Sequence, residues 1–244
     1  MTPTTRTTIG AGAAVLIAVA GYFGTRPLAA AVALLICVAA IGWPSIMRIA
    51  HRKAATAIMV ASGAIAVFAV AVGRGEPYLR YAVAAAAAAI LLALTSEILF
   101  PSPRGRAVAS VSGLAAGGLV AVSAAAWLAT GRTAGARDLV VAAAVCLAVA
   151  SVASTLTSKA NVNGIIAVLL GGAAGAGLGS VFDTVTIVGG LLVGLVAAAS
   201  VLIIGELARR EPAPRTTWAG ITSGVAPVLI AGALVYIGGR LLVG

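Results

Sequence analysis

Two glutamates carry the first candidate chemistry, because each lies a few residues before the end of a long apolar run. They are Glu97 and Glu206, and the chain has only six acidic residues in all. A carboxylate at the C-terminal end of a helix opposes the helix dipole, so it requires a cationic partner. Arginines follow both glutamates, and Arg104, Arg106, Arg209 and Arg210 are their candidate partners. The candidate binding residues here are Glu97, Arg104, Arg106, Glu206, Arg209 and Arg215.

The two stretches also share a Pro-x-Pro-Arg motif, at residues 101–104 and 212–215. Paired prolines end one helix and stiffen the link to the next. One interpretation is structural, a glutamate–arginine clamp that fixes this turn. The other is functional, a cation-lined site at the cytoplasmic face for a lipid headgroup or a phosphate. The residues alone leave both interpretations open.

Asp183 is the third acidic candidate, because it is the only charged residue between Lys159 and Glu206. An ionisable group inside a membrane marks a functional site by default. Asp183 would be the deepest such group if the helices on either side of it form a tight hairpin. The alternative is a turn at the outer surface, in which Asp183 and Thr184 cap the next helix.

Several kinds of chemistry are excluded by the residue counts. The chain has one histidine, His51, and two cysteines, Cys37 and Cys146, that lie in apolar runs, which excludes a Cys/His metal site. The sequence has no Walker lysine, no dinucleotide-binding glycine pattern and no HExxH motif. We therefore predict no metal, no cofactor and no catalytic residue, and an enzyme is not the favoured interpretation.

The elements that must position these residues are membrane helices. The chain is 61% hydrophobic and 9% charged, against roughly 25% charged residues in soluble domains, so most of its surface requires lipid as solvent. A helix needs about 20 apolar residues to cross a bilayer. That length predicts an all-α, polytopic transmembrane bundle of eight or nine helices, at residues 9–24, 27–46, 54–73, 79–100, 107–130, 138–157, 163–180, 184–205 and 217–240.

The basic residues predict the orientation of this bundle. Ten Lys and Arg residues fall on one side of the predicted spans and six on the other, and the side richer in Lys and Arg is usually cytoplasmic. We expect an inner-membrane protein with its N-terminus in the cytoplasm and its C-terminus outside. Because the basic residues lie singly or in small groups, the net charge of +10 indicates contact with anionic lipid headgroups rather than with nucleic acid.

The repeated motif predicts an internal duplication. Its two copies are 111 residues apart, and the same offset places Arg26 on Arg137 and Arg48 on Lys159. We therefore expect two parallel four-helix units, at residues 1–106 and 107–216, followed by a terminal helix at 217–244. Such repeats are common in transporters, which often place a binding site between the halves.

Two classes of function follow from this organisation. The favoured class is a transporter-like or permease-like protein, or a non-catalytic membrane subunit of a larger envelope complex with protein partners in the membrane. The alternative is a membrane enzyme or binding protein that acts on a phospholipid headgroup at the cytoplasmic face. The small number of acidic residues and the absence of a nucleophile–base pair favour the first class.

Overall fold

The computed structural model describes residues 2–73, 75–133, 137–157, 159–210 and 216–242. These residues form helices joined by short links, and no strand occurs among them. In chain order the helices are α1 (Pro3–Phe23), α2 (Thr25–Ile46), α3 (Arg52–Val72), α4 (Ala82–Leu99), α5 (Ala107–Arg132), α6 (Arg137–Ala153), α7 (Ala160–Gly179), α8 (Ile187–Arg210) and α9 (Thr217–Leu242).

The lengths and compositions of these helices confirm the predicted all-α helical bundle. Within the described ranges, eight helices are long and apolar enough to cross a membrane. The exception is α6, which has 17 residues because the chain leaves the helix at Ala153 and turns before α7. This is the architecture of a multi-pass membrane protein. The identity of the membrane and the orientation in it stay predictions.

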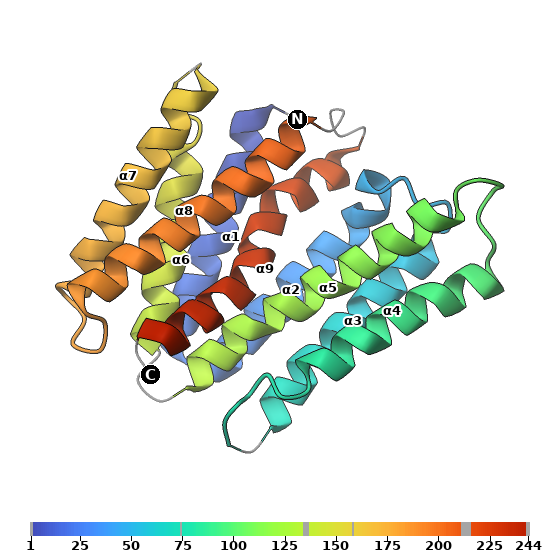
Figure 1. Cartoon of the computed structure of the whole chain (residues 1–244), viewed down its shortest axis with the longest axis horizontal. Coiled ribbons are helices and arrows are strands. Elements are labelled where there is room, and N and C mark those ends of the chain that lie inside the picture. Colours follow the sequence, from blue (N-terminus) through green and yellow to red (C-terminus); the bar gives the residue numbers. More distant parts are fainter. Residues whose placement is uncertain (1, 74, 134–136, 158, 211–215, 243–244) are drawn as a thin grey trace.

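Consecutive helices run antiparallel, so α1 begins at one end of the bundle and α9 finishes at the other (Figure 1). We call the end at which α1 begins the N-terminal end. Helices α2, α4, α6 and α8 end at this end of the bundle, and α3, α5, α7 and α9 begin there (Figure 1). Helices α3, α4 and α5 form one flank, α6, α7 and α8 form the other, and α9 lies between them (Figure 1).

Helix α9 connects the two flanks, because it packs against α1, α2, α5, α6 and α8. Helix α5, the first helix of the predicted second unit, packs mainly against α3, α4, α2 and α9. Helix α1 packs closely against α6, so the first helix of each predicted unit contacts the second helix of the other. The unit boundaries at residues 106 and 216 and the duplication stay predictions.

Glycine and alanine allow these helices to approach until their backbones touch, and the closest pair is α7 and α8. A Cβ atom placed on Gly175 would lie 2.1 Å from the carbonyl oxygen of Gly190, and one on Gly194 would lie 2.2 Å from the carbonyl oxygen of Gly171. In lipid, helix association depends on such close packing rather than on hydrophobic burial. The two helices therefore form a tight hairpin.

Capping residues move several helix ends away from the predicted spans. The first helix begins at Pro3 rather than at residue 9, because the Thr2 side chain caps it by accepting a hydrogen bond from the backbone N–H of Thr5 at 3.2 Å. Helix α8 begins at Ile187 rather than at residue 184, since the Thr186 hydroxyl accepts from the N–H of Gly189 at 3.0 Å. Polar caps, rather than hydropathy, set both of these ends.

Candidate functional site

A cavity of about 140 Å³ lies at the N-terminal end of the bundle, where α1, α6, α7, α8 and α9 meet. We call it the end cavity. Its volume is about ten times the roughly 10–15 Å³ that one water molecule needs, so it can hold a small solute or a lipid headgroup. Its wall combines apolar side chains with the polar residues Arg6, Thr7, Ser151, Ser154, Thr155, Asn163, Arg209 and Ser223.

The end cavity extends into the bundle from its surface. Gly10, which forms part of the wall, lies seven residues after the start of α1 at Pro3, or roughly 10 Å along the helix. Pro227 of α9 also lines the cavity, ten residues after Thr217, or roughly 15 Å. The inner part of the wall therefore lies roughly two to three helical turns from the helix ends.

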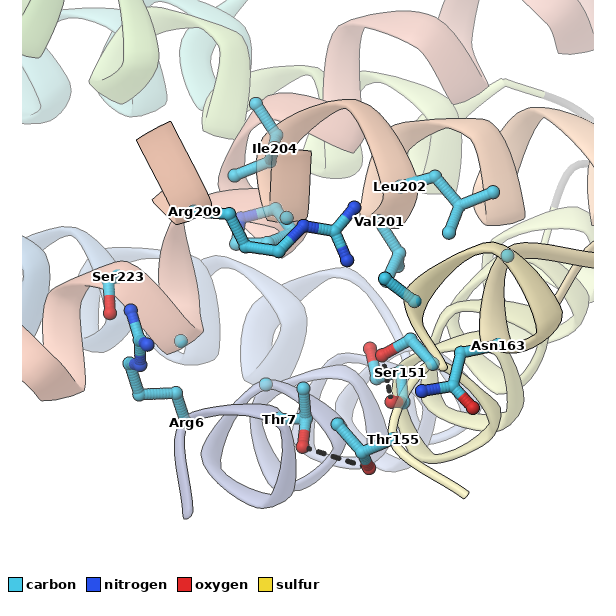
Figure 2. Close-up of a pocket in the computed structure, with 17 residues that line it drawn as sticks. Arg6, Thr7, Ser151, Thr155, Asn163, Val201, Leu202, Ile204, Arg209 and Ser223 are labelled. Atoms are coloured by element: carbon cyan, nitrogen blue, oxygen red, sulfur yellow. Dashed lines mark hydrogen bonds between the residues drawn. The ribbon is translucent and has the colours of Figure 1, made fainter. Parts of the chain in front are cut away.

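The crossing of α1 and α9 positions Arg6. A Cβ atom on Gly224 would lie 2.5 Å from the carbonyl oxygen of Arg6, and one on Gly10 would lie 2.7 Å from the carbonyl oxygen of Gly224. Because the two backbones touch here, Arg6 on the first turns of α1 lies beside Ser223 of α9. Figure 2 shows these two side chains on one side of the cavity, with Arg209 extended between them and the residues of α6 and α7.

The opposite wall is built by the link between α6 and α7. The Asn163 carboxamide oxygen accepts from the backbone N–H and from the hydroxyl of Thr157, both at 2.7 Å, and its amide donates to the Thr157 carbonyl at 2.8 Å. The Ser154 hydroxyl donates to the carbonyl oxygen of Ser151 at 2.7 Å. Asn163 lies buried in the first turn of α7 and holds this link in place.

Replacing Asn163 with alanine is expected to lower the free energy of unfolding by about 1–3 kcal/mol, because its buried carboxamide makes three hydrogen bonds that join Thr157 to α7. Denaturant titration of the purified protein measures the change. The matched control is Asn161→Ala, which removes an exposed amide two residues earlier in the same helix and should change stability by less than about 0.5 kcal/mol. Equal effects of the two substitutions would contradict this role for Asn163.

Arg209 enters the end cavity from the last turn of α8, where it pairs with Glu206. Its Nε donates to Glu206 Oε2 at 3.0 Å, and the neighbouring Arg210 donates from Nε to Oε1 at 3.2 Å. Glu206, Arg209 and Arg210 are all about half-exposed or more, so these pairs add little stability. Their effect is to neutralise the glutamate and to hold the Arg209 side chain against the cavity.

Two residues that line the end cavity, Arg6 and Ser151, each have a side-chain donor without a protein partner among the described residues. Arg6 Nε is buried and has no hydrogen-bond partner among the described residues. Ser151 is 4% exposed and lines the cavity, and its hydroxyl makes no hydrogen bond within the described ranges. Buried polar groups in proteins are almost always satisfied. Arg6 Nε is an exception to this rule, and the Ser151 hydroxyl, on the cavity wall, is free to donate to a polar ligand or to water.

The first glutamate of the sequence pair lies elsewhere. Glu97 on α4 accepts from the backbone N–H of Ser102 at 2.7 Å and from the Ser102 hydroxyl at 2.9 Å. It thus holds the Pro-x-Pro turn through a serine, whereas the structural interpretation expected an arginine. Arg106 donates to the carbonyl oxygen of Arg48 at 2.6 Å, and Arg104 is exposed.

The predicted site residues are therefore distributed over three places. Helix α4, which carries Glu97, packs on α3 and α5, whereas α8, which carries Glu206, packs on α6, α7 and α9. Asp183 is exposed in the turn between α7 and α8, at the opposite end of the bundle from the end cavity. Arg215 lies outside the described residues. Of the predicted binding residues, Arg209 is the one that lines the end cavity.

Sequence reasoning missed most of the residues that line the end cavity. Arg6 was counted only among the ten basic residues on the side predicted to be cytoplasmic, and Ser151, Thr155 and Ser223 were not considered. These residues come from helices far apart in the chain, and no spacing connects them. The one available signal was the short polar segment 154–159, which contains several hydroxyl side chains between two apolar runs.

Among the described residues, no group of three or more His, Cys, Asp or Glu side chains is placed to hold a metal ion. No protein-family model, no curated protein and no solved structure matches this chain. The fold and the site therefore define the class on their own. The chain has the architecture of a multi-pass helical membrane protein, with an arginine-containing polar cavity at one end of the bundle.

Proposed function

We propose that this multi-pass membrane protein is permease-like and binds its solute in the end cavity. The observation that carries the proposal is the cavity itself, a polar space that reaches roughly 10–15 Å into a bundle packed with alanine and glycine. A transporter in one of its two states presents such a space, open toward one side of the membrane. We keep the predicted orientation, with the N-terminal end of the bundle in the cytoplasm.

Helix α9 has a feature that suits this function. Pro227 lies inside α9 and lines the end cavity. Because proline has no N–H, the carbonyl oxygen of Ser223 loses its usual partner in the helix, next to the ligand space. Helix kinks and hinges in membrane proteins commonly occur at such positions. A change of angle at Pro227 would open or close the wall that α9 contributes.

A labelling experiment tests the permease-like function without knowledge of the solute. In a background with Cys37→Ala and Cys146→Ala, Ser151→Cys places a thiol in the wall of the end cavity. A membrane-impermeant maleimide is added to sealed vesicles of either orientation. A protein that alternates between two states exposes this thiol to both sides, so we expect labelling from both sides, with the faster reaction at the N-terminal end.

Two control positions define the sidedness of this experiment. Ser180→Cys is exposed at the opposite end of the bundle and should react from that side alone. Ser62→Cys, at a buried position away from the end cavity, should react from neither side. Labelling of Ser151→Cys from the N-terminal end alone would remove the permease-like function and leave a static binding protein or a membrane subunit.

The alternative function is the binding of a phospholipid headgroup. The observation that favours it is the position of Arg209 in the last turn of α8, where an arginine would meet the headgroup region. The anionic lipid partners proposed for the basic end of the bundle fit the same chemistry. This alternative predicts labelling of Ser151→Cys from one side and slower labelling in membranes rich in anionic lipid.

A further inference from the structure

We propose that the end cavity binds a phosphate group, held between the guanidinium groups of Arg6 and Arg209. This inference names the ligand of the cavity on which the proposed function rests. The phosphate could belong to a free solute or to a lipid headgroup, since both present the same tetrahedral oxyanion.

The charge around the end cavity favours an anion. Arg6 and Arg209 both line it, and no carboxylate does so among the described residues. Glu206, the nearest acidic side chain to Arg209, is held by two arginines at once, so the turn keeps a net positive charge. An arginine presents several donors in a fixed fork that matches the geometry of phosphate oxygens.

The helix ends add to this charge. Helices α1, α7 and α9 all begin at this end of the bundle, whereas α6 and α8 finish there. A helix N-terminus carries a partial positive charge and free N–H groups, which favour anions. Three N-termini against two C-termini leave a field of the same sign as the arginines.

The directions of the donors favour phosphate over a carboxylate. The Arg6 guanidinium and the Ser151 hydroxyl both belong to the wall of the end cavity. They lie on different walls, on α1 and on α6. A carboxylate has two oxygens in one plane, whereas a phosphate has oxygens in several directions and can accept from opposing walls at once.

Equilibrium dialysis of the purified full-length protein in detergent, with radiolabelled inorganic phosphate as the probe, tests this inference. We expect saturable binding that Arg6→Gln and Arg209→Gln each weaken about 10- to 100-fold, which is the usual effect of losing one charged hydrogen bond. The matched control is Arg210→Gln, which removes the same charge one residue further on, outside the cavity wall, and should change affinity less than about threefold.

A second variant tests the location without changing any charge. A Cβ atom on Gly164, in the cavity wall, would meet only the Leu202 side chain, at 3.8 Å, so Gly164→Leu fits the fold but fills the space. It should lower phosphate affinity at least about tenfold. The melting temperature of each variant is recorded, so loss of binding in a folded protein is distinguished from unfolding.

Two further comparisons show whether the anion is a lipid headgroup or a free solute, and whether it is a phosphate or a carboxylate. Nanodiscs that contain phosphatidic acid are compared with nanodiscs that contain diacylglycerol, which lacks only the phosphate. If phosphatidic acid protects the Ser151→Cys thiol from labelling and inorganic phosphate does not bind, the ligand is a lipid headgroup. Equal affinity for acetate and phosphate, or no binding of any of these probes, would overturn the inference. Two-sided labelling of Ser151→Cys would then still support a permease-like protein for another solute.

Discussion

Replacing Gly175 with leucine is expected to prevent α7 and α8 from packing and to abolish the folded bundle. A Cβ atom at this position would lie 2.1 Å from the carbonyl oxygen of Gly190 and 2.9 Å from its carbonyl carbon. Both are backbone atoms, which cannot turn aside as a flexible side chain would. Overpacking of a core usually costs about 1–3 kcal/mol, and a clash with backbone across two helices should cost more than about 3 kcal/mol.

The matched control is Gly177→Leu, two residues further along the same helix. A Cβ atom on Gly177 has no neighbour within 4 Å, so leucine there is accommodated, and helix propensity favours it over glycine by up to about 1 kcal/mol. Size-exclusion chromatography and unfolding in a denaturing detergent measure both variants. A folded Gly175→Leu protein with unchanged stability would show that the α7–α8 contact is looser than described.

Replacing Trp127 with alanine should cost about 3–5 kcal/mol of unfolding free energy, which is typical of a tryptophan truncated in a core. Trp127 is fully buried in α5, and its Nε1 donates to the carbonyl oxygen of Val228 in α9 at 2.8 Å. This carbonyl lies next to Pro227, so the tryptophan ties the flank of α3, α4 and α5 to the interrupted part of α9. The side chains around the void left by the indole ring would lose their packing contacts with it.

Trp127→Phe separates packing from hydrogen bonding in this prediction. Phenylalanine keeps most of the ring volume but leaves the carbonyl of Val228 without its partner, so the expected loss is about 1–3 kcal/mol. Trp218→Ala, at a position 47% exposed, is the control for the loss of a tryptophan as such. It should lower the unfolding free energy less than Trp127→Ala does. Thermal unfolding of the three variants ranks them, and a Trp127→Ala protein as stable as Trp218→Ala would contradict this account.

The helices could be predicted from the sequence because lipid demands long apolar segments, and each predicted segment is a helix in the structure. The ends of these segments were less predictable, because hydropathy does not report capping. Thr2 and Thr186 do not stand out in a hydropathy profile, yet their hydroxyls accept the hydrogen bonds that cap the first turns of α1 and α8. A tight hairpin of α7 and α8 was raised only as the condition for a deep Asp183, since small residues are so frequent that their spacing singles out no pair of helices.

The candidate site was only partly predictable. Arg209 and its pairing with Glu206 follow from the need of a carboxylate for a cation at a helix C-terminus. Arg6 and Ser151 could not be predicted as partners, because their proximity depends on how α1 packs against α6 and α9. Glu97 and Glu206 resemble each other in sequence, but tertiary packing places them in separate environments.

Protection of a thiol by ligand tests the central claim most directly, namely that the end cavity is the binding site of a phosphate-bearing ligand. In the cysteine-free background, Ser151→Cys is labelled from the N-terminal end of the bundle with and without saturating inorganic phosphate, and with acetate as the control anion. We predict that phosphate slows the labelling of Ser151→Cys at least about tenfold, that acetate does not, and that Ser180→Cys reacts at one rate throughout. Labelling of Ser151→Cys at the same rate with and without phosphate, and in vesicles with and without phosphatidic acid, would contradict the account.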